Sequence, residues 1–369
     1  MKTGFVWHER YCWHDYGAFA GPMRNVYPVE PGHAAEHAET KRRIKNLLDA
    51  TEFIERLTPV KPRAATMDEL LAVHTREYLD SVKALSDANG GMIGFAAFVG
   101  PGSYEIAALS AGGVIAATDA VMSGDVDNAY ALVRPPGHHA QAQTGMGYCV
   151  FANVALAVKY ARKIYGLDRI AVVDWDVHHG NGTQSIFYDD PGVLTVSIHQ
   201  DGVFPRNSGY TSETGEGRGE GYNINIPLPP GCGDGAYRAA FERVVLPALY
   251  AFKPQMIFVA CGFDAGMNDP LARMMLGPES FRWMTGKTLQ AARDLSDGRL
   301  VMAHEGGYHA PSVPFLALPV FEELTGERAP IENPMSALVA SFPATELQPH
   351  QDVFVEAARK AAGAAAWRK

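Results

Sequence analysis

Residues 174–182, DWDVHHGNG, place several polar side chains directly after the apolar run IAVV, which reads as a buried strand. If that strand continues to about residue 178, the alternation of side chains puts Asp174, Asp176 and His178 on one face. Two carboxylates and an imidazole on one face are a pattern typical of metal ligands. The adjacent His179 falls on the opposite face, and we expect it to be structural.

A further carboxylate, Asp264 in CGFDAG, follows a different apolar run and is flanked by glycines. Three protein ligands would leave an open position for water and substrate, as a catalytic zinc requires. The oxygen-rich donor set is also compatible with Fe²⁺, Co²⁺ or Mn²⁺. The alternative is that these side chains only cap a helix and hydrogen-bond within the core.

Two adjacent histidines, His138 and His139, lie in RPPGHHAQ after another apolar run. Adjacent residues on a loop rarely bind one metal together, but they can act as a base and an acid beside it. Each imidazole then needs an orienting acceptor on its other ring nitrogen. Asp174 and Asn181 are the two candidates for this role.

Three aromatic residues lie beside these clusters. Tyr308, in EGGYH, could donate a hydrogen bond to a developing oxyanion. Tyr148 in MGYC and Phe204 in VFPRN could form an apolar slot for a methylene chain, or could simply pack in the core. His199 and His309 are interpreted as ordinary strand-end or loop histidines.

Apolar strands and helices alternate along the chain, which predicts an α/β fold with a mostly parallel sheet covered by helices on both faces. Helices are expected at about 39–55, 67–85, 105–124, 151–166, 236–254 and 278–296 and over the last 27 residues, 343–369. The segments 8–37 and 86–104 are expected to be long loops. Ligands bind beyond the carboxyl ends of parallel strands, where each polar cluster lies, so we expect one shared site.

We find no linker or composition break and expect one domain over residues 1–369. The net charge of −9 and the lack of a basic stripe argue against a nucleic-acid partner. The four cysteines never form a CxxC pair, and Cys149 and Cys261 are expected to be buried thiols. We see no signal-type stretch and no apolar span of about 20 residues, so we expect a cytoplasmic protein with no membrane partner.

Several motifs together resemble the histone deacetylase superfamily, from about residue 4 to residue 325. PPGHH, DWDVHHGNGTQ, GFDA and EGGY occur in that family's order, accompanied by the weaker markers HAETKRR, HTREYL and MGYC. DWDVHHGNGTQ with EGGY is similar to the class II branch and its bacterial relatives, the deacetylase-like amidohydrolases and acetylpolyamine amidohydrolases. The resemblance implies a single α/β domain with a central eight-stranded parallel sheet, the arginase/deacetylase fold.

The resemblance also assigns roles. Asp176, His178 and Asp264 match the family's zinc ligands. His139 would be the general base that activates water, while His138 would act electrostatically or protonate the leaving amine. Asp174 would hydrogen-bond His138 and Asn181 would hydrogen-bond His139, where another branch has Asp. Tyr308 would polarise the scissile carbonyl and stabilise the oxyanion.

Further positions match the family's substrate tunnel and its potassium sites. Gly147, Tyr148 and Phe204 line the acyl-lysine tunnel in relatives, and Tyr148 stands where Phe is usual. Structural K⁺ would be bound at one site by Asp174, Asp176, His178 and Ser197, and at a second around Phe187 and Val193. The segment GMIGFAAFVGPGSYE has no acid where many eukaryotic relatives carry an aspartate that holds a peptide backbone.

We therefore expect a zinc-dependent amide hydrolase that removes acyl groups, above all acetyl, from amines such as acetylpolyamines or acyl-lysine. Its partners would be that substrate and further copies of the chain, as a dimer or tetramer, with segment 8–37 narrowing the mouth or mediating subunit contacts. A hydrolase of other small or xenobiotic amides would use the same chemistry. The pattern also leaves open a dinuclear manganese hydrolase and a non-catalytic acyl-amine binding module.

Overall fold

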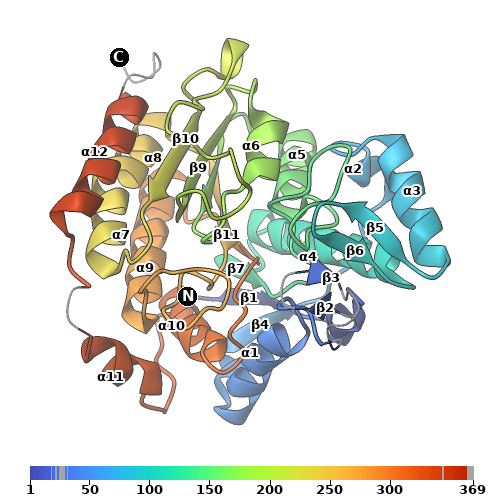
Figure 1. The fold of residues 1–369 in the computed structure, drawn as a ribbon, viewed down its shortest axis with the longest axis horizontal. Coiled ribbons are helices and arrows are strands. Elements are labelled where there is room, and N and C mark those ends of the chain that lie inside the picture. Colours follow the sequence, from blue (N-terminus) through green and yellow to red (C-terminus); the bar gives the residue numbers. More distant parts are fainter. Residues whose placement is uncertain (18, 21–22, 25–29, 31, 343–344, 364–369) are drawn as a thin grey trace.

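A parallel sheet forms the centre of the computed structural model, which describes all residues except 18, 21–22, 25–29, 31, 343–344 and 364–369 (Figure 1). Its strands, in chain order, are β1 (Thr3–Val6), β4 (Leu57–Val60), β7 (Asn128–Ala131), β8 (Ile170–Asp174), β9 (Val193–Gln200), β10 (Asn223–Leu228), β11 (Met256–Cys261) and β12 (Leu300–His304). Their spatial order is β10-β9-β8-β11-β12-β7-β1-β4, and every neighbouring pair is parallel. The expectation of an eight-stranded parallel sheet is thus confirmed.

The sheet separates two hydrophobic cores, because successive side chains on a strand point to opposite faces. In β8, Ala171 and Val173 belong to one core, and Ile170 and Val172 belong to the other. Both faces are therefore apolar, which explains why these strands read as continuous hydrophobic runs.

Helices cover both faces of the sheet (Figure 1). The first core is covered by α1 (Glu39–Ala50), α7 (Asp234–Ala240), the π-helical turn η4 (Phe241–Val245), α8 (Leu246–Phe252), α9 (Pro278–Leu295), α10 (Val313–Thr325) and α12 (Pro349–Gly363). The second core is covered by α2 (Met67–Leu70), α3 (Arg76–Asp87), α4 (Ser103–Met122), α5 (Asn153–Tyr165) and α6 (Asn181–Phe187). The remaining elements are α11 (Pro334–Ala340), the 3₁₀ turns η1 (Glu9–Trp13), η2 (Phe53–Arg56) and η3 (Gly217–Gly219), and two antiparallel pairs, β2 (Phe19–Ala20) with β3 (Met23–Arg24) and β5 (Gly91–Gly94) with β6 (Ala97–Val99).

Helix α4 is long and apolar enough to cross a membrane by length and composition, contrary to the expectation of no such span. It is nevertheless mostly buried, and its alanine, valine and isoleucine side chains belong to the second core. We therefore interpret α4 as a core helix, packed between the sheet and its neighbours.

The apolar pattern does not reveal the two edge strands, and each contains a proline, Pro59 in β4 and Pro227 in β10. Proline cannot donate to a β-ladder, so it is confined to edge strands, where one side needs no donor. In each of these strands the proline interrupts the apolar run by which the strand could have been predicted. The same proline also explains why the strand lies at an edge of the sheet.

Four expected segments differ in the structure. The predicted helix at 67–85 is divided into α2 and α3, because the Thr75 side chain accepts from the Tyr78 N–H and starts a new helix. The expected loop at 86–104 contains the β5–β6 hairpin. The helix predicted at 39–55 ends at Ala50, and η2 follows it. Within 343–369 the helix is α12, and the ends of that range, like parts of the 8–37 loop, lie outside the described residues.

A buried ionic cluster ties the segment before α1 to the end of β7. Glu36 accepts from Arg134 Nε at 2.9 Å and lies 2.8 Å from Lys41 Nζ, and all three side chains are almost fully buried. Arg134 also donates to the carbonyl oxygens of Tyr11 and His14, at 2.9 and 2.7 Å. The N-terminal segment is thereby attached directly beside the start of the PPGHH loop.

Glu36→Gln is expected to lower the free energy of unfolding by about 3–5 kcal/mol, because it leaves two buried cations without their counter-charge. Denaturant titration measures this loss, and Glu39→Gln, which removes an exposed partner of Arg42, is the control with an expected effect below about 1 kcal/mol. Burial alone would raise the pKa of Glu36, but the positive charges of Arg134 and Lys41 hold that pKa below its ordinary value of 4.5. The contribution is therefore complete above pH 4.5 and is lost on acidification below it. Equal effects of the two variants would contradict this account.

Candidate active site

The polar clusters found in the sequence meet at one edge of the sheet. They follow strands β7, β8, β11 and β12, which lie next to one another in the order β8-β11-β12-β7. Because all four strands are parallel, their carboxyl ends lie at the same edge. The loops after these strands therefore bring together residues that are up to about 170 positions apart in the chain.

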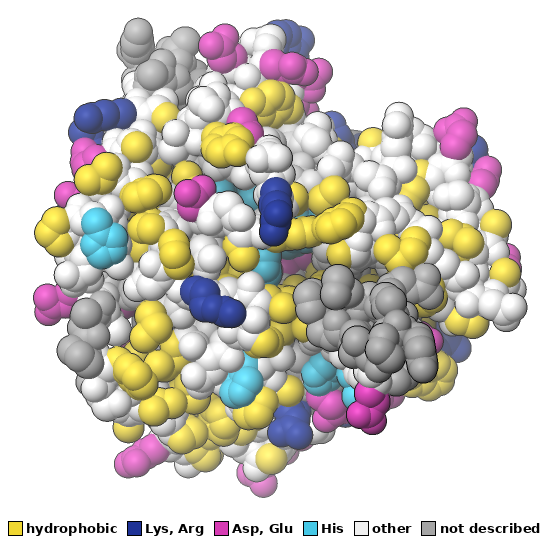
Figure 2. Space-filling model, viewed as in Figure 1, with side chains coloured by type: hydrophobic (Ala, Val, Ile, Leu, Met, Phe, Trp, Pro, Cys, Tyr) yellow, Lys and Arg dark blue, Asp and Glu magenta, His cyan; other side chains and the backbone are white. Residues whose placement is uncertain are grey.

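A cavity of about 390 Å³ opens over this edge. It is lined by Phe95, Ala96, His139, Gly147, Tyr148, His178, Val203, Phe204, Pro270, Leu271 and Tyr308. In Figure 2, histidine side chains are visible between hydrophobic ones near the middle of this face. A volume of this size and a mainly apolar lining with a few polar groups are typical of a small-molecule site.

Asp176, His178 and Asp264 form a compact group of possible metal ligands, with donor atoms all within 4.8 Å of one another. His178 Nδ1 lies 3.1 Å from Asp176 Oδ1 and 3.0 Å from Asp264 Oδ2. Asp174 is outside this group. Strand β8 ends at Asp174, so the expectation that the strand continues to about residue 178 is wrong.

The charge of this group favours a cation. Although burial opposes charge on the imidazole, hydrogen bonds to Asp176 and Asp264 raise the pKa of His178 to about 10. Burial, reinforced by Asp176, raises the pKa of Asp264 to about 8. Two buried carboxylates therefore require a compensating positive charge between them. A divalent metal ion would supply that charge, and two oxygens with one nitrogen leave a coordination position open.

The backbone of the EGGYH loop closely surrounds the two carboxylates. The Gly306 N–H donates to Asp176 Oδ2 at 2.7 Å. A Cβ at position 306 would lie 2.2 Å from Asp264 Oδ2 and 2.6 Å from Asp176 Oδ2, so only glycine allows this approach. Gly306 therefore orients the Asp176 carboxylate through its N–H group and, because it has no side chain, leaves space for the Asp264 carboxylate.

The structure pairs each tandem histidine with a different acceptor. His138 Nδ1 lies 3.0 Å from Asp174 Oδ2, and His139 Nδ1 lies 2.7 Å from Asn181 Oδ1. Because the Asn181 carbonyl oxygen can only accept, Nδ1 of His139 must carry the proton, and Nε2 is left with a free lone pair. His139 can therefore accept a proton, and of the two histidines it is the one that lines the cavity.

The two imidazoles are driven toward opposite protonation states. Although burial opposes its charge, Asp176 and Asp174 raise the pKa of His138 well above its ordinary value. Burial lowers the pKa of His139 well below its ordinary value, and the charges on His138 and His178 act in the same direction. Paired groups with diverging pKa values are the arrangement expected for an acid and a base.

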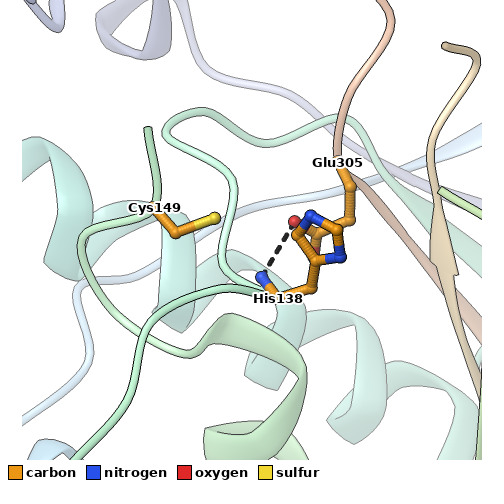
Figure 3. A group of neighbouring side chains, drawn as sticks. All are labelled: His138, Cys149 and Glu305. Carbon is orange, nitrogen blue, oxygen red and sulfur yellow. Dashed lines mark hydrogen bonds between the residues drawn. The ribbon is translucent and has the colours of Figure 1, made fainter. Parts of the chain in front are cut away.

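Glu305 lies beside His138 and bonds to the backbone of the loop that carries the tandem histidines (Figure 3). Its Oε2 accepts from the N–H groups of Gly137 and His138, at 2.7 and 3.1 Å. His138, Cys149 and Glu305 also have possible ligand atoms within 4.8 Å. Burial raises the pKa of the Cys149 thiol well above its ordinary value, which keeps it protonated. We therefore interpret this second group as a support for the loop, not as a metal site.

Tyr308 reaches the cavity from the same loop as Gly306. Its backbone N–H donates to Asp269 Oδ2 at 2.7 Å, and its ring centroid lies 6.2 Å from that of His178. Burial raises the pKa of the Tyr308 phenol well above its ordinary value. The phenol is therefore neutral and can donate a hydrogen bond beside the possible metal ligands.

The three expected tunnel residues all line the cavity. The Phe204 ring lies 4.9 Å from the His139 ring at 81°, an edge-to-face contact. Gly147 and Tyr148 have φ values of 52° and 69°. A Cβ at Gly147 would lie 2.4 Å from His139 Cδ2, so glycine at this position leaves the imidazole its space.

The two expected potassium sites lie in different places. At the first, Asp174 is the register partner of Ser197, the Asp176 N–H donates to Asp174 and the His178 N–H donates to Asp176. At the second, Phe187 ends α6 and Val193 starts β9, and both are bonded to the backbone of Asp190. His179 is turned away from the metal group, since its ring nitrogens lie 2.7 Å from Ser208 Oγ and 3.0 Å from Gln184 Oε1. The two ring nitrogens of His199 are bonded to Ser197 Oγ and to the carbonyl oxygen of Gly209. His309 Nδ1 is bonded to Ser312 Oγ.

Three residues of the site are not recognisable in the sequence. Glu305 lies within EGGYH and Asp269 within GMNDP, but both act through backbone N–H groups distant in the sequence, which no local pattern reveals. Phe95 is hidden by its glycine-rich surroundings, which indicate a loop. An acid directly after a predicted strand is the available signal for Glu305.

Known proteins resemble this chain over most of its length. A profile of the histone deacetylase domain matches residues 34–324. The chain is 51% identical over 337 residues to a histone deacetylase-like amidohydrolase of Pseudomonas aeruginosa, covering 90% of this chain and 89% of that protein. It is 37% identical to a probable deacetylase of Archaeoglobus fulgidus, over 88% of this chain and 87% of that one. The crystal structure of the HDA15 HD domain matches with a TM-score of 0.85 and 32% identity, covering 98% and 94% of the two chains.

Gly306→Ala is expected to weaken divalent metal binding at least about tenfold, because the new Cβ would push the carboxylates out of place. Calorimetric titration of the metal-free protein measures the affinity. Gly363→Ala is the matched control, since a Cβ there meets nothing within 4 Å. A folded Gly306→Ala protein with unchanged metal affinity would refute this role of the loop.

Proposed function

Because this chain belongs to the histone deacetylase family and is a hydrolytic deacetylase, we propose that it is a zinc-dependent enzyme that removes acetyl groups from amines. One observation carries the proposal. The possible metal ligands Asp176, His178 and Asp264 are grouped at a cavity that is also lined by His139, with its free Nε2, and by Tyr308. A ligand group, a base and a hydrogen-bond donor around one space are what metal-assisted amide hydrolysis needs.

Zinc suits the donor set, and Fe²⁺ or Co²⁺ are compatible with the same ligand types. A metal ion bound there would polarise the amide carbonyl and increase the acidity of a water molecule. The chain itself contributes the ligand geometry. Backbone N–H groups of Gly306 and Val177 hold the two carboxylates, at 2.7 and 2.8 Å.

His139 is proposed as the general base. Its low pKa keeps it neutral, and its Nε2 can take a proton from the attacking water. His138, paired with Asp174, would stay protonated and stabilise the developing negative charge. Since the rings lie 3.9 Å apart, a proton taken by His139 is delivered beside His138, and either can protonate the departing amine.

Tyr308 is proposed as the oxyanion donor. Its neutral phenol would bond more strongly to the oxyanion of the tetrahedral intermediate than to the ground-state carbonyl, which is the condition for lowering the barrier. The bond from its backbone N–H to Asp269 holds the loop in position before substrate arrives.

The apolar walls made by Tyr148 and Phe204 favour a substrate with a methylene chain next to the amide, as in acyl-lysine or an acylated polyamine. Structural potassium, a homo-oligomer, a cytoplasmic location and the absence of nucleic-acid and membrane partners stay predictions.

The metal-loaded protein is expected to hydrolyse an acetyl-lysine amide or an N-acetylpolyamine, and chelation should remove essentially all turnover, with recovery when zinc is added back. Release of acetate measures the rate. Turnover that survives complete metal removal would contradict the metal mechanism. Tight substrate binding without any turnover would instead favour a non-catalytic binding module.

Tyr308→Phe is expected to lower kcat by about 10²–10³-fold with little change in KM, since one oxyanion donor is lost while the ring is kept. Steady-state kinetics on the zinc-loaded enzyme provides the readout. Tyr210→Phe, which removes a hydroxyl from a half-exposed tyrosine outside the cavity lining, serves as the control. A kcat within tenfold of the parent value would exclude this role for Tyr308.

A further inference from the structure

Phe95 is unusually exposed for its size. Its relative exposure is 71%, the highest among the exposed large hydrophobic side chains of the described residues. It lies between β5 and β6, at the tip of the hairpin that replaces the expected loop. Exposing an aromatic side chain on a fixed turn forgoes the free energy of burial, so the position of Phe95 calls for an explanation.

Backbone hydrogen bonds attach the tip of this hairpin to the cavity wall. The N–H of Gly145 donates to Ile93 O at 3.1 Å, and the N–H of Gly147 donates to Phe95 O at 3.1 Å. Tyr148 N–H donates to Ala96 O at 2.8 Å. Gly147 and Tyr148 are themselves tunnel-wall residues, so Phe95 is positioned by the same segment that shapes the substrate slot.

Phe95 continues an aromatic row that leads to the proposed base. Its ring stacks on that of Phe204 with centroids 6.1 Å apart and planes 19° from parallel. Phe204 in turn contacts the ring of His139. Both phenylalanines line the cavity, so the row runs along the path that a substrate would take from the surface.

The lining of the cavity has no carboxylate among the described residues. Two acids lie close to this lining in the sequence. Asp269 is buried and already bonded to the N–H groups of Leu271 and Tyr308, and Asp201, two residues before Val203, is exposed and lies outside the lining. An ammonium group beside this row would find no carboxylate in the lining, and its cation–π attraction to an exposed phenyl ring would be weak. An apolar or aromatic group would instead bury the exposed surface of Phe95.

We propose that Phe95 and Phe204 form an aromatic clamp at the cavity mouth that selects amides whose amine portion is uncharged and apolar or aromatic beyond the methylene chain. N-acetylpolyamines, whose amine portion carries further ammonium groups, are disfavoured substrates. The inference rests on the proposed function and narrows its substrate class. Phe95 acts in it as a specificity-determining residue that contacts the substrate outside the slot.

The test compares Phe95→Ala with the parent enzyme, both zinc-loaded, on two substrates. One is Nε-acetyl-lysine with its α-amine acylated and its carboxyl group capped as an uncharged aromatic amide, and the other is N-acetylspermidine. Phe95→Ala is expected to lower kcat/KM for the capped substrate by about tenfold through KM, because apolar contact area is lost. For N-acetylspermidine the change is expected to stay within about twofold.

Two further variants make the comparison specific. Phe342→Ala also removes a phenylalanine that is partly exposed, but one outside the cavity lining, and is expected to leave both substrates unaffected. Phe95→Glu adds a carboxylate at the mouth and should shift the preference toward N-acetylspermidine. If Phe95→Ala does not fold, Phe95→Leu replaces it, with a smaller loss for the capped substrate.

The outcomes separate the inference from the function on which it rests. A parent enzyme that hydrolyses neither substrate overturns the proposed function and the clamp together. A parent enzyme that hydrolyses the substrates, with Phe95→Ala affecting both equally or neither, overturns only the clamp. A parent preference for N-acetylspermidine over the capped substrate also overturns it.

Discussion

The site depends on one electrostatic constraint: four buried carboxylates, Asp174, Asp176, Asp264 and Glu305, gather at the carboxyl ends of neighbouring strands. Burying such groups is costly unless each is compensated by a charge or by hydrogen-bond donors. The structure compensates them with imidazoles and with backbone N–H groups from loops after other strands, as at Gly306. A cation held by Asp176 and Asp264 would complete the compensation, so the burial of these carboxylates and their suitability for a metal ion have the same physical origin.

The same constraint explains why the residues that line the cavity are held by further polar residues outside the lining. Tyr308 and His139 line the cavity, but Asp269 and Asn181 determine how they are presented, through bonds to a backbone N–H and a ring nitrogen. Behind them, the buried pair of Glu36 with Arg134 fixes the start of the histidine loop. Small displacements in these outer layers would be passed to the reacting groups, since effective catalysis requires them to be held in position.

The interior of the fold is readable in the sequence because central parallel strands are uninterrupted apolar runs and the motifs follow them directly. The edge strands are not, since Pro59 and Pro227 interrupt their runs, and neither is the β5–β6 hairpin, whose glycines indicate a loop. The metal group is predictable from residue types, although the alternation argument fails at Asp174, where the strand ends. Glu305 is marked in the sequence only as an acid after a strand, and its role is hidden because its partners are backbone groups about 170 residues away.

The order of these strands also governs when the site can exist during synthesis. Strand β1 lies between β7 and β4, and β12 lies between β11 and β7, so the middle of the sheet is incomplete until the chain has passed residue 304. Gly306, which donates to Asp176 from 130 positions away, is synthesised only after β12. A nascent chain that is still shorter than this exposes the carboxylates and apolar strand edges together, and parallel sheets of such long-range pairing fold slowly. The group of possible metal ligands therefore acquires its full set of hydrogen-bond donors only when the sheet is complete.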